Sequence, residues 1–520
     1  FKALGNWARN NADPFDLALS RGKEGDGLAS LWTKHRGKHV CYADPAHPFR
    51  LQGSADLNSY KLFTELFWSL LTNCGRLGVI LPTGIYSDLG TRELRNTFIS
   101  SGTIDYIYAF QNERRIFSAA HHAMKQAVLV SSKGGKTVSF LTRFRMGVGD
   151  SPDAHDIPDD LLRKDELALV VTPDDLRNSS PNSVSLVELK SARDLSIFRT
   201  IGRSSFRLGQ PPSGWEISYS REFDMTSDSK HFPPLGKWLE RGFSVDALGR
   251  FNGPEGAVAI PFFEGRMIGQ HDCSQKGWVS GKGRTAVWRA IPFDNKTIEP
   301  QYLMALETLK TWPKANSGIK VAIMDITAST NTRSMISVAT SCFPFGHSAP
   351  VLTVAHGDFS KSLFVSAVLN SFVFDFAARP RVGGVHFTWF VLEECPLPKM
   401  PDSETVCLDE VAVDTARLAL LHRRFAPEWL RLRQMYPQLA KNEWKHWWAV
   451  TEIDRLRLRV EIDALCADLY GLEPDDFDWI VRDDPKDPKG FYRVDRQLPF
   501  RERLTGLAAA AFRALKEGKW

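Results

Sequence analysis

The spacing of apolar residues predicts alternating helices and strands in the first part of the chain. Between residues 62 and 71 apolar side chains recur at i, i+4 and i+8 on two adjacent rows, the pattern of an amphipathic helix with a core-facing side. Residues 91–99 predict a second helix. Short apolar runs predict strands, the first of them of the buried parallel kind, at 77–82, 104–110, 126–130 and 138–141. This alternation indicates an α/β fold in which helices cover a wound sheet.

The pattern changes twice further along the chain. Residues 1–147 form the predicted α/β domain, and 148–204 are polar and rich in Pro and Asp, which is typical of a connector. Residues 205–402 carry short β-rich runs with many Gly and Pro, which favours a mixed α/β domain. Residues 403–520 are almost wholly helical. There Ile453, Leu456 and Val460 keep close to helical spacing, and Arg455, Arg457 and Arg459 are expected on the other faces.

Composition narrows the functional classes only modestly. The 520 residues include 66 Lys or Arg and 61 Asp or Glu, a net charge of +5 that permits a polyanionic partner without requiring one. No apolar run is long enough to span a membrane, and the first residues lack the features of a secretory signal. Seven cysteines without a CxxC pair indicate reduced thiols, so we expect a cytoplasmic protein without a zinc ribbon. The histidines at 121, 122, 271, 347 and 386 lack metal-ligand spacing, and no metal site is predicted.

Several segments resemble one enzyme family. Residues 56–63 (DLNSYKLF) followed by 75–82 (GRLGVILP) resemble the amino-methylating DNA methyltransferases, above all the group whose target-recognition domain follows the catalytic domain. Weaker matches follow at 104–110, 115–117, 125–130, 172–176, 181–182, 261–268 and 331–333. The most specific match is 369–379 (LNSFVFDFAAR), continued by 382–388 (VGGVHFT). The resemblance extends over residues 56–480, nearly the whole chain.

The resemblance implies the carboxyl-terminal half of a large adenine-N6 DNA methyltransferase, from a type IIG-like restriction–modification or phage-exclusion (BREX- or DISARM-like) system. Its fold would be the second half of a Rossmann-like methyltransferase sheet, followed by the recognition domain and the helical region. The family's glycine-rich cofactor loop and its Asn/Asp-Pro-Pro-aromatic motif are absent. The pairs Pro211-Pro212 and Pro233-Pro234 follow Gln210 and Phe232, so neither pair has the motif's Asn or Asp. We expect both parts upstream of residue 1, and we expect this segment to be inactive by itself.

The resemblance also assigns cofactor and target-base residues. It places Phe63 against the adenine ring of S-adenosylmethionine, with Asn58 and Tyr60 at the start of the same helix, although the missing half would bind most of the cofactor. It places Phe117 against the flipped target base, where an aromatic ring restores part of the lost stacking. The alternatives are a core-facing Phe63 and a buried strand-edge Phe117.

DNA-contacting residues are predicted in the recognition region, which carries sixteen Lys or Arg against twelve Asp or Glu between residues 240 and 400. Arg379 and Arg381 flank Pro380 in a turn before Gly383-Gly384, where two guanidinium groups would project from a stiff loop. The further candidates carry side chains that pair with base edges or phosphates, namely Arg266, Gln270, His271, Asn331, Arg333 and His386. The alternative for the arginines of the turn is a salt bridge to Asp375, Glu393 or Glu394.

Two other functional interpretations stay open at this stage. Pro173-Asp174 followed by Glu188-Leu189-Lys190 mimics the arrangement of metal-dependent nucleases, but Thr172 and Asp175 instead favour a capped helix start. The second alternative is a non-catalytic DNA-recognition or assembly subunit of a defence complex. Double-stranded DNA is the expected partner in both the methyltransferase and the subunit hypotheses. The methyltransferase hypothesis also predicts the missing half as a partner, in the same or a separate chain. Other subunits of a defence system are possible partners under both hypotheses.

Overall fold

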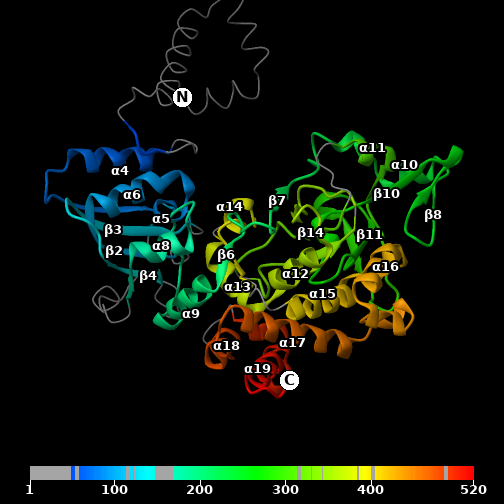
Figure 1. The fold of residues 1–520 in the computed structure, drawn as a ribbon. Coiled ribbons are helices and arrows are strands. Elements are labelled where there is room, and N and C mark those ends of the chain that lie inside the picture. Colours follow the sequence, from blue (N-terminus) through cyan, green and yellow to red (C-terminus); the bar gives the residue numbers. More distant parts are fainter. Residues whose placement is uncertain are drawn as a thin grey trace, which may run out of the picture. The chain divides into compact units, whose positions relative to one another are not determined.

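The computed structural model describes residues 49–52, 58–112, 117–118, 120–121, 124–146, 168–312, 318–329, 331–341, 343–382, 386–399, 405–484 and 490–520. The chain divides into two compact units (Figure 1). Unit 1 comprises Phe1–Pro173 with Ser183–Ser185, and unit 2 comprises Asp174–Asn182 with Leu186–Trp520. Residues 148–167 of the predicted connector, 148–204, lie outside the described residues.

Unit 1 is built on a five-stranded sheet with the order β1-β3-β2-β4-β5. Its strands are β1 (Arg76–Pro82), β2 (Gly102–Phe110), β3 (Gln126–Lys133), β4 (Phe140–Met146) and β5 (Leu169–Val171). All four predicted strands are therefore present. Figure 1 shows α4 (Ser59–Leu70) and α6 (Arg92–Ser100) beside this sheet; the short α5 (Gly84–Ser87) and the 3-10 turn η1 (Leu89–Thr91) follow β1.

The sheet is mainly antiparallel, and the run at 77–82, predicted as a buried parallel strand, pairs antiparallel with β3. β3 pairs antiparallel with both β1 and β2, β4 with β5 likewise, and only β2 and β4 are parallel. Parallel neighbours need a crossover, usually a helix, and the described residues between β2 and β3 form none. Among the described strands β1 pairs only with β3, so it is an edge strand and not a buried central one. Because β1 and β2 both oppose β3, they run in the same direction and end at the same edge of the sheet.

Helix α4 is amphipathic, but its apolar side is the exposed one. Four large apolar residues on it are 36–72% exposed: Phe63, Leu66, Phe67 and Leu70. The buried residues are Lys61, Thr64, Glu65 and Trp68. The Glu65 carboxylate accepts the Leu51 N–H at 3.1 Å, and the Trp68 ring packs edge-on against Phe98 at 4.9 Å. The amphipathic helix predicted from the sequence is present, and unit 1 buries the side opposite to its large apolar residues.

Unit 2 holds several smaller sheets. One has the order β13-β10-β9-β8, a second has the order β15-β14-β16-β7, and the pairs β11-β12 and β17-β6 stand alone. The strands are β6 (Ser205–Arg207), β7 (Ile217–Ser220), β8 (Ser244–Val245), β9 (Phe251–Asn252), β10 (Val258–Phe262), β11 (Lys276–Ser280), β12 (Val287–Ala290), β13 (Tyr302–Ala305), β14 (Lys320–Ile323), β15 (Ser337–Thr340), β16 (Val351–Val354) and β17 (Pro396–Pro398).

The helices of unit 2 include α8 (Pro173–Ser179), which begins at the last residue of unit 1, then α9 (Ala192–Arg203), α10 (Leu235–Leu239), α11 (Leu306–Thr311), α12 (Phe359–Asn370), α13 (Phe372–Ala378), α14 (Trp389–Leu392), α15 (Thr405–Ala419), α16 (Ala426–Met435), α17 (Glu452–Leu469), α18 (Pro474–Val481) and α19 (Leu504–Lys516). The 3-10 turns used below are η5 (Gly265–Met267) and η8 (Arg423–Phe425). The region after residue 403 is helical, as the sequence predicted.

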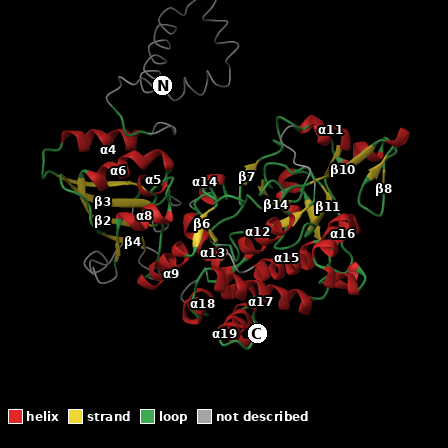
Figure 2. Ribbon diagram, in the orientation of Figure 1, coloured by secondary structure: helices red, strands yellow, loops and turns green. Residues whose placement is uncertain are grey.

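The recognition region and the helical region share one core. Helices α12, α15, α17 and α19 follow one another in layers away from the strands β14 and β16 (Figure 2). One cluster of buried residues joins Leu352 and Phe364 to Ile462, Tyr470 and Phe512. Among the described residues no single helix is long and apolar enough to cross a membrane; α12 and Phe372–Arg381 pass that test only as a pair bent by 67°.

Helix α17 also differs from its predicted orientation. Ile453, predicted on the apolar side, is 79% exposed, whereas Arg455 is buried. The Arg455 guanidinium donates to the Leu418 carbonyl at 2.8 Å and lies 3.6 Å from the centre of the Phe293 ring. A buried arginine is tolerated here because backbone carbonyls and an aromatic face replace its water.

Candidate functional site

Two loops of unit 1 meet at the edge of the sheet where β1 and β2 end. The first begins at Thr83 and continues into α5, and the second begins at Gln111 and leads to β3. The Thr83 N–H donates to the Lys125 carbonyl at 3.4 Å, which ties the first loop to the end of the second. In open α/β sheets, ligands bind beyond the carboxyl ends of the strands. This edge is therefore the candidate site of unit 1.

Asn112 fixes the loop after β2. Its side-chain oxygen accepts the Phe117 N–H at 2.9 Å, and its Nδ2 donates to the carbonyls of Phe117 and Ala120 at 3.1 and 3.0 Å. Asn112 itself is only 1% exposed. The amide thus holds a turn whose first and last parts are described, with residues 113–116 and 119 outside the described residues.

Phe117 lies on this loop with its ring partly exposed. The ring meets Phe110, the last residue of β2, edge to face at 6.2 Å. It also packs at the margin of a small apolar cluster formed by Tyr108 and Phe110. Phe117 is thus neither fully buried nor fully exposed, and Phe110 supports one part of its ring.

The loop after β1 is closely packed around Gly84. A Cβ added there would lie 2.6 Å from the Tyr60 hydroxyl and 2.4 Å from a carboxylate oxygen of Asp88, so a side chain would displace both. Burial, and then the Asp88 charge, raise the pKa of Tyr60 to about 12, so this hydroxyl stays protonated. The buried Arg95 holds the turn by donating to the carbonyls of Ile85 and Asp88 at 2.9 and 2.7 Å.

The three residues predicted to bind the cofactor lie in one turn of α4 but face different ways. Tyr60 points inward to Gly84. Asn58 is the exposed N-cap residue and its side chain makes no capping hydrogen bond. Phe63 is 55% exposed and stacks on Phe67 with the ring centres 6.0 Å apart. Phe63 is therefore not a core residue of unit 1, and its exposed ring fits a planar group such as adenine.

Two predicted DNA-contacting residues converge on the segment that follows β14. The exposed His386 places Nδ1 2.8 Å from Oδ2 of the buried Asp325. Two residues further on, the Thr327 hydroxyl oxygen accepts from Nδ2 of the exposed Asn331 at 3.3 Å. His386 and Asn331 are 55 positions apart in the sequence, yet one short segment carries both. Arg266 is also exposed, on η5, where it donates to the Gly283 carbonyl at 3.3 Å.

Three other candidates are buried around the break between α12 and α13. Arg333 and Arg379 are 7% and 9% exposed, and each places Nε 3.2 Å from a carboxylate oxygen of Asp375. His271 is 3% exposed; burial, and then Arg459, Arg455 and Arg333, lower its pKa well below the ordinary value. These side chains are enclosed, so the structure offers none of them to DNA. For Arg379 the salt bridge to Asp375, the alternative above, is present.

The last two candidates are partly buried. Gln270 donates to the Asn370 carbonyl at 3.3 Å, beside the same helix break. Arg381 donates to the Ser180 hydroxyl at 2.7 Å and to the Ser179 carbonyl at 2.9 Å, so it anchors the end of α8 instead of projecting from a loop. Gly383 and Gly384, the other half of the predicted turn, lie outside the described residues.

Several residues of these sites were not recognised in the sequence. Neither Asn112 nor Asp325 belongs to a recognisable sequence motif. The partners of Asn112 are backbone groups of its own loop. Asp325 is bound by His386, which is distant in the sequence. Around Asp325 the structure adds Arg221, whose Nη2 lies 3.6 Å from Oδ1 of Asp325. Arg221 also donates to the Tyr219 hydroxyl at 3.1 Å, and the Tyr219 ring stacks on Trp389 at 5.3 Å. An aromatic pair beside an exposed arginine and histidine is a suitable surface for nucleic acid.

The first part of the nuclease-like arrangement is the start of a helix. Asp174 lies in the first turn of α8, which begins at Pro173 as the helix interpretation predicted, and pairs with Arg177 at 3.1 Å. In the part of the chain that the structure describes, no group of three His, Cys, Asp or Glu side chains could hold a metal ion.

No protein family model matches the sequence, and no curated protein matches it. Three solved structures similar to the chain come from restriction–modification enzymes. The type IIG restriction endonuclease BpuSI is 12% identical (TM-score 0.29, 81% of this chain, 50% of that one). The type IIL enzyme MmeI in complex with DNA is 10% identical (TM-score 0.39, 82% and 51%). A protein from a type I restriction–modification system is 11% identical (TM-score 0.23, 29% of this chain, 34% of that one). The chain thus spans about half the length of BpuSI and MmeI, and about a third of the type I protein.

Proposed function

We propose that this chain is part of a site-specific, S-adenosylmethionine-dependent DNA adenine-N6 methyltransferase of a restriction–modification or anti-phage defence system. Unit 1 would supply one half of the catalytic sheet and the wall of the target-base pocket, and unit 2 would supply DNA recognition. The observation that carries the proposal is Phe117, whose partly exposed ring rests on Phe110 and whose backbone is held by Asn112, beyond the sheet edge where β1 and β2 end.

The exposed edge strand of unit 1 and the apolar side of α4 support the proposal that this sheet is one half of a larger sheet. Another segment or another protein would supply the second half. Within the described residues β1 is an edge strand, and Ile80 on it is 57% exposed. Beside it α4 presents Phe63, Phe67 and Leu70 to solvent. A long apolar edge with an apolar helix face is a liability in a free protein, since it favours aggregation. Both would be covered by the sheet half that carries the glycine-rich loop and the Asn/Asp-Pro-Pro-aromatic motif.

Each site residue has a limited task in this proposal. The cofactor would supply the methyl group, and the exposed Phe63 would stack against its adenine ring. The Tyr60 hydroxyl, protonated at neutral pH, and Gly84 would shape the loop beside it. Phe117 would stack on the extruded target base, for which base–aromatic contact contributes about 1–3 kcal/mol. Asn112 would be a positioning residue that keeps the Phe117 backbone in place.

On unit 2 the exposed candidates are grouped on one surface. His386 and Asn331 converge on the segment after β14, and Arg221 with the Tyr219–Trp389 pair lies at the same Asp325. We assign DNA contact to this surface and to Arg266. We do not assign it to His271, Arg333 or Arg379, whose burial gives them a structural role.

The experiment is to express the chain with the protein or segment that carries the missing motifs, and to measure N6-methyladenine in plasmid DNA by mass spectrometry. Phe117→Ala should lower methylation by roughly 5- to 150-fold, the stacking energy above expressed as a rate, while binding to unmodified duplex stays unchanged. Phe117→Trp, the matched control, should keep most of the activity. Full activity and an unchanged flipping signal from a fluorescent base analogue in Phe117→Ala would overturn the assignment.

The alternative is a DNA-recognition or assembly subunit without chemistry of its own. It is favoured only by the separateness of unit 2, which carries the exposed basic and aromatic surface and has its own core. Under this alternative the assembled complex binds DNA through unit 2. Neither the wild-type chain nor the Phe117→Ala variant then changes the amount of N6-methyladenine in the DNA.

A further inference from the structure

Unit 2 contains a cavity of about 810 Å³ that the proposed function does not use. The residues that line it come from α10, the β8–β9 hairpin, β11, the segment 294–300 and the chain around η8. Its size lies within the range of small-molecule sites in proteins, roughly 300–1,000 Å³. The Asp325 surface described above contributes no lining residue.

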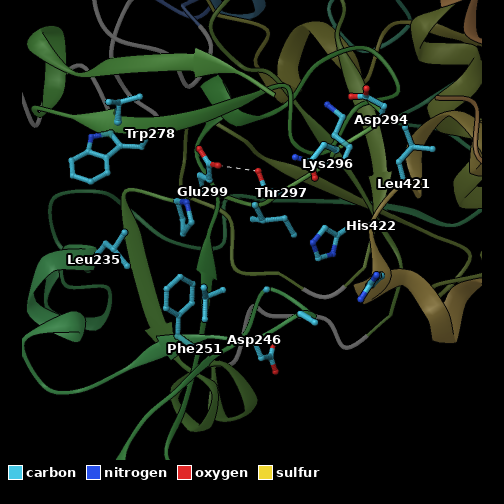
Figure 3. Close-up of a pocket in the computed structure, with 18 of the residues that line it drawn as sticks. Leu235, Asp246, Phe251, Trp278, Asp294, Lys296, Thr297, Glu299, Leu421 and His422 are labelled. Atoms are coloured by element: carbon cyan, nitrogen blue, oxygen red, sulfur yellow. Dashed lines mark hydrogen bonds between the residues drawn. The ribbon is translucent and has the colours of Figure 1, made fainter. Parts of the chain in front are cut away.

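One side of the cavity is apolar and aromatic. Figure 3 shows Trp278 and Leu235 on this side, with Phe251 below them. Two further apolar residues of the lining, Leu239 and Val245, are 50% and 59% exposed. Exposed apolar side chains grouped in a hollow are stabilised when a ligand covers them, by about 25 cal/mol per Å² of apolar surface. The Trp278 ring is held by its Nε1, which donates to the Gly281 carbonyl at 2.9 Å.

The opposite side presents hydrogen-bond donors and cations. Figure 3 shows the His422 ring pointing into the cavity. Its Nδ1 accepts the Arg424 N–H at 3.1 Å, so the proton of the neutral ring is on Nε2. Burial, followed by the Arg424 and Arg423 charges, lowers the pKa of His422 to about 4, so the ring is neutral at pH 7. Arg423 and Lys445 line the cavity beside it, and Arg423 makes no side-chain hydrogen bond or ion pair within the described part of the chain.

Most other charges of the lining are already compensated by neighbours. Glu299 pairs with Arg289, Lys296 with Asp272 at 2.7 Å, and Asp246 with Arg250 at 2.8 Å. The exposed Asp294 remains as a carboxylate at the rim. Lys445 Nζ lies 4.0 Å from a carboxylate oxygen of Glu443. Arg423 is therefore the cation beside His422 that has no ion pair within the described residues, and the wall that faces it is aromatic.

We propose that this cavity binds a nucleotide unit, a heteroaromatic base stacked on Trp278 with its phosphate on Arg423 and Lys445. A purely apolar ligand would leave these two cations unused, and a simple anion would leave the aromatic wall uncovered. The same chemistry has two sources, a free mononucleotide or an unstacked nucleotide of a single DNA strand. The proposal is independent of methyl transfer, because it rests on side chains of unit 2 alone.

The test is calorimetric titration of the purified full chain with adenosine monophosphate, adenosine, ribose 5-phosphate and a six-residue single-stranded oligodeoxynucleotide. The nucleotide or the oligonucleotide should bind, and adenosine and ribose 5-phosphate should each bind at least tenfold more weakly, since each satisfies one side only. Binding of the mononucleotide identifies a free nucleotide as the source. Binding of the oligonucleotide alone identifies a DNA strand.

Three variants localise the site. Trp278→Ala should weaken binding roughly 5- to 150-fold, the range for one base stacked on an aromatic ring, and Arg423→Ala should weaken it about tenfold. Arg457→Ala, an exposed arginine of α17 that does not line the cavity, should have no effect. Circular dichroism and thermal unfolding establish that each variant is folded. The proposal is overturned if no nucleotide or oligonucleotide binds up to millimolar concentration, or if Arg423→Ala and Trp278→Ala, both folded, bind like wild type.

Discussion

At the scale of single residues, burial separates side chains that look equivalent in the sequence. Arg266 is exposed, whereas Arg333 and Arg379 are enclosed and share the carboxylate of Asp375. That carboxylate also accepts the Ser334 N–H at 2.8 Å. Asn370, at the end of α12, exchanges two hydrogen bonds with the Ser337 backbone. The segment 369–379, the most specific match in the sequence, is therefore an internal junction of unit 2.

Replacing Arg379 tests this structural role. Arg379→Ala removes one partner of a buried carboxylate and exposes the face of Phe491, which the guanidinium covers at 4.5 Å. Because Asp375 keeps Arg333 and Ser334, we expect a loss of about 2–3 kcal/mol in unfolding free energy, less than for a lone buried pair. Urea denaturation measures this loss. The DNA affinity of Arg379→Ala at two salt concentrations should equal that of the wild type. Arg266→Ala, at an exposed position, is the control variant. A salt slope lowered by about one unit without loss of stability would instead make Arg379 a phosphate contact.

The carboxyl group of Glu264 predicts a pH dependence of stability. Burial raises its pKa from the ordinary 4.5 to about 7, with Arg266 opposing the shift, and its Oε2 has no hydrogen-bond partner in the described residues. Between pH 4.5 and 7 the folded state holds a proton that the unfolded chain has released. This group therefore lowers stability as the pH rises, and the loss is complete above pH 7.

The variant Glu264→Gln removes this ionisation. We expect no change in stability at pH 4 and a gain of up to about 3 kcal/mol at pH 8, since one pKa unit corresponds to about 1.4 kcal/mol. Urea titrations of wild type and variant at several pH values measure the difference. Glu307→Gln, at an exposed position, serves as the control and should follow wild type. Parallel curves for wild type and Glu264→Gln would show that Glu264 ionises as in water.

At the scale of elements, helix α4 shows that amphipathicity alone does not decide which side is buried. Its polar side is enclosed because Glu65 accepts hydrogen bonds from residues 50–52 and Trp68 fills the space beside α6. Its apolar side, around Phe67 and Leu70, is thereby left for another surface. The sheet of unit 1 has the same property, since β1 has one described neighbour.

A pair of substitutions on opposite sides of α4 tests this orientation. Leu70→Glu, at a position 72% exposed, should change the stability of the isolated chain by no more than about 0.5 kcal/mol and should reduce self-association. Trp68→Ala, on the enclosed side, should cost about 3–5 kcal/mol. Thermal unfolding and sedimentation velocity measure the two effects. Equal destabilisation by both variants would mean that the apolar side of α4 is buried in solution.

At the scale of the whole molecule, the two units divide the proposed work between them. Unit 1 carries the sheet edge with Phe117, and unit 2 carries the exposed basic and aromatic surface as well as the nucleotide-sized cavity. The sequence contains neither a glycine-rich cofactor loop nor an Asn/Asp-Pro-Pro-aromatic motif. In the proposed function Phe63 would stack on the cofactor, and a single aromatic ring is too small a contact for tight binding.

The chain by itself should therefore neither bind S-adenosylmethionine nor methylate DNA. Calorimetry of the purified 520-residue chain should give no heat of binding at micromolar concentrations of S-adenosylmethionine. The assembly with the missing half should bind this cofactor. A DNA-binding measurement on the same preparation serves as the control for folded unit 2. Micromolar affinity of the isolated chain for the cofactor would contradict the half-sheet interpretation.

The sequence by itself determined the positions of three strands of unit 1 and of several helices. β1, β2, β3 and α6 lie where the apolar runs predicted them, because such runs reflect local backbone preferences and burial. The helical character of the region after residue 403 has the same origin. The start of α8 at Pro173 was also readable, since capping and proline act within one turn.

The tertiary structure alone decided the direction of the strands and which side of each helix is buried. It also decided which charged side chains are buried and which are exposed. Strand β3 returns antiparallel because the segment before it forms no described crossover helix. Arg333 and Arg455 are enclosed because Asp375 and the Leu418 carbonyl, each distant from its arginine in the sequence, compensate them. His386 and Asn331 meet only through the segment after β14. Each of these outcomes depends on contacts between distant segments, and hydrophobic periodicity along the chain carries no information about such partners.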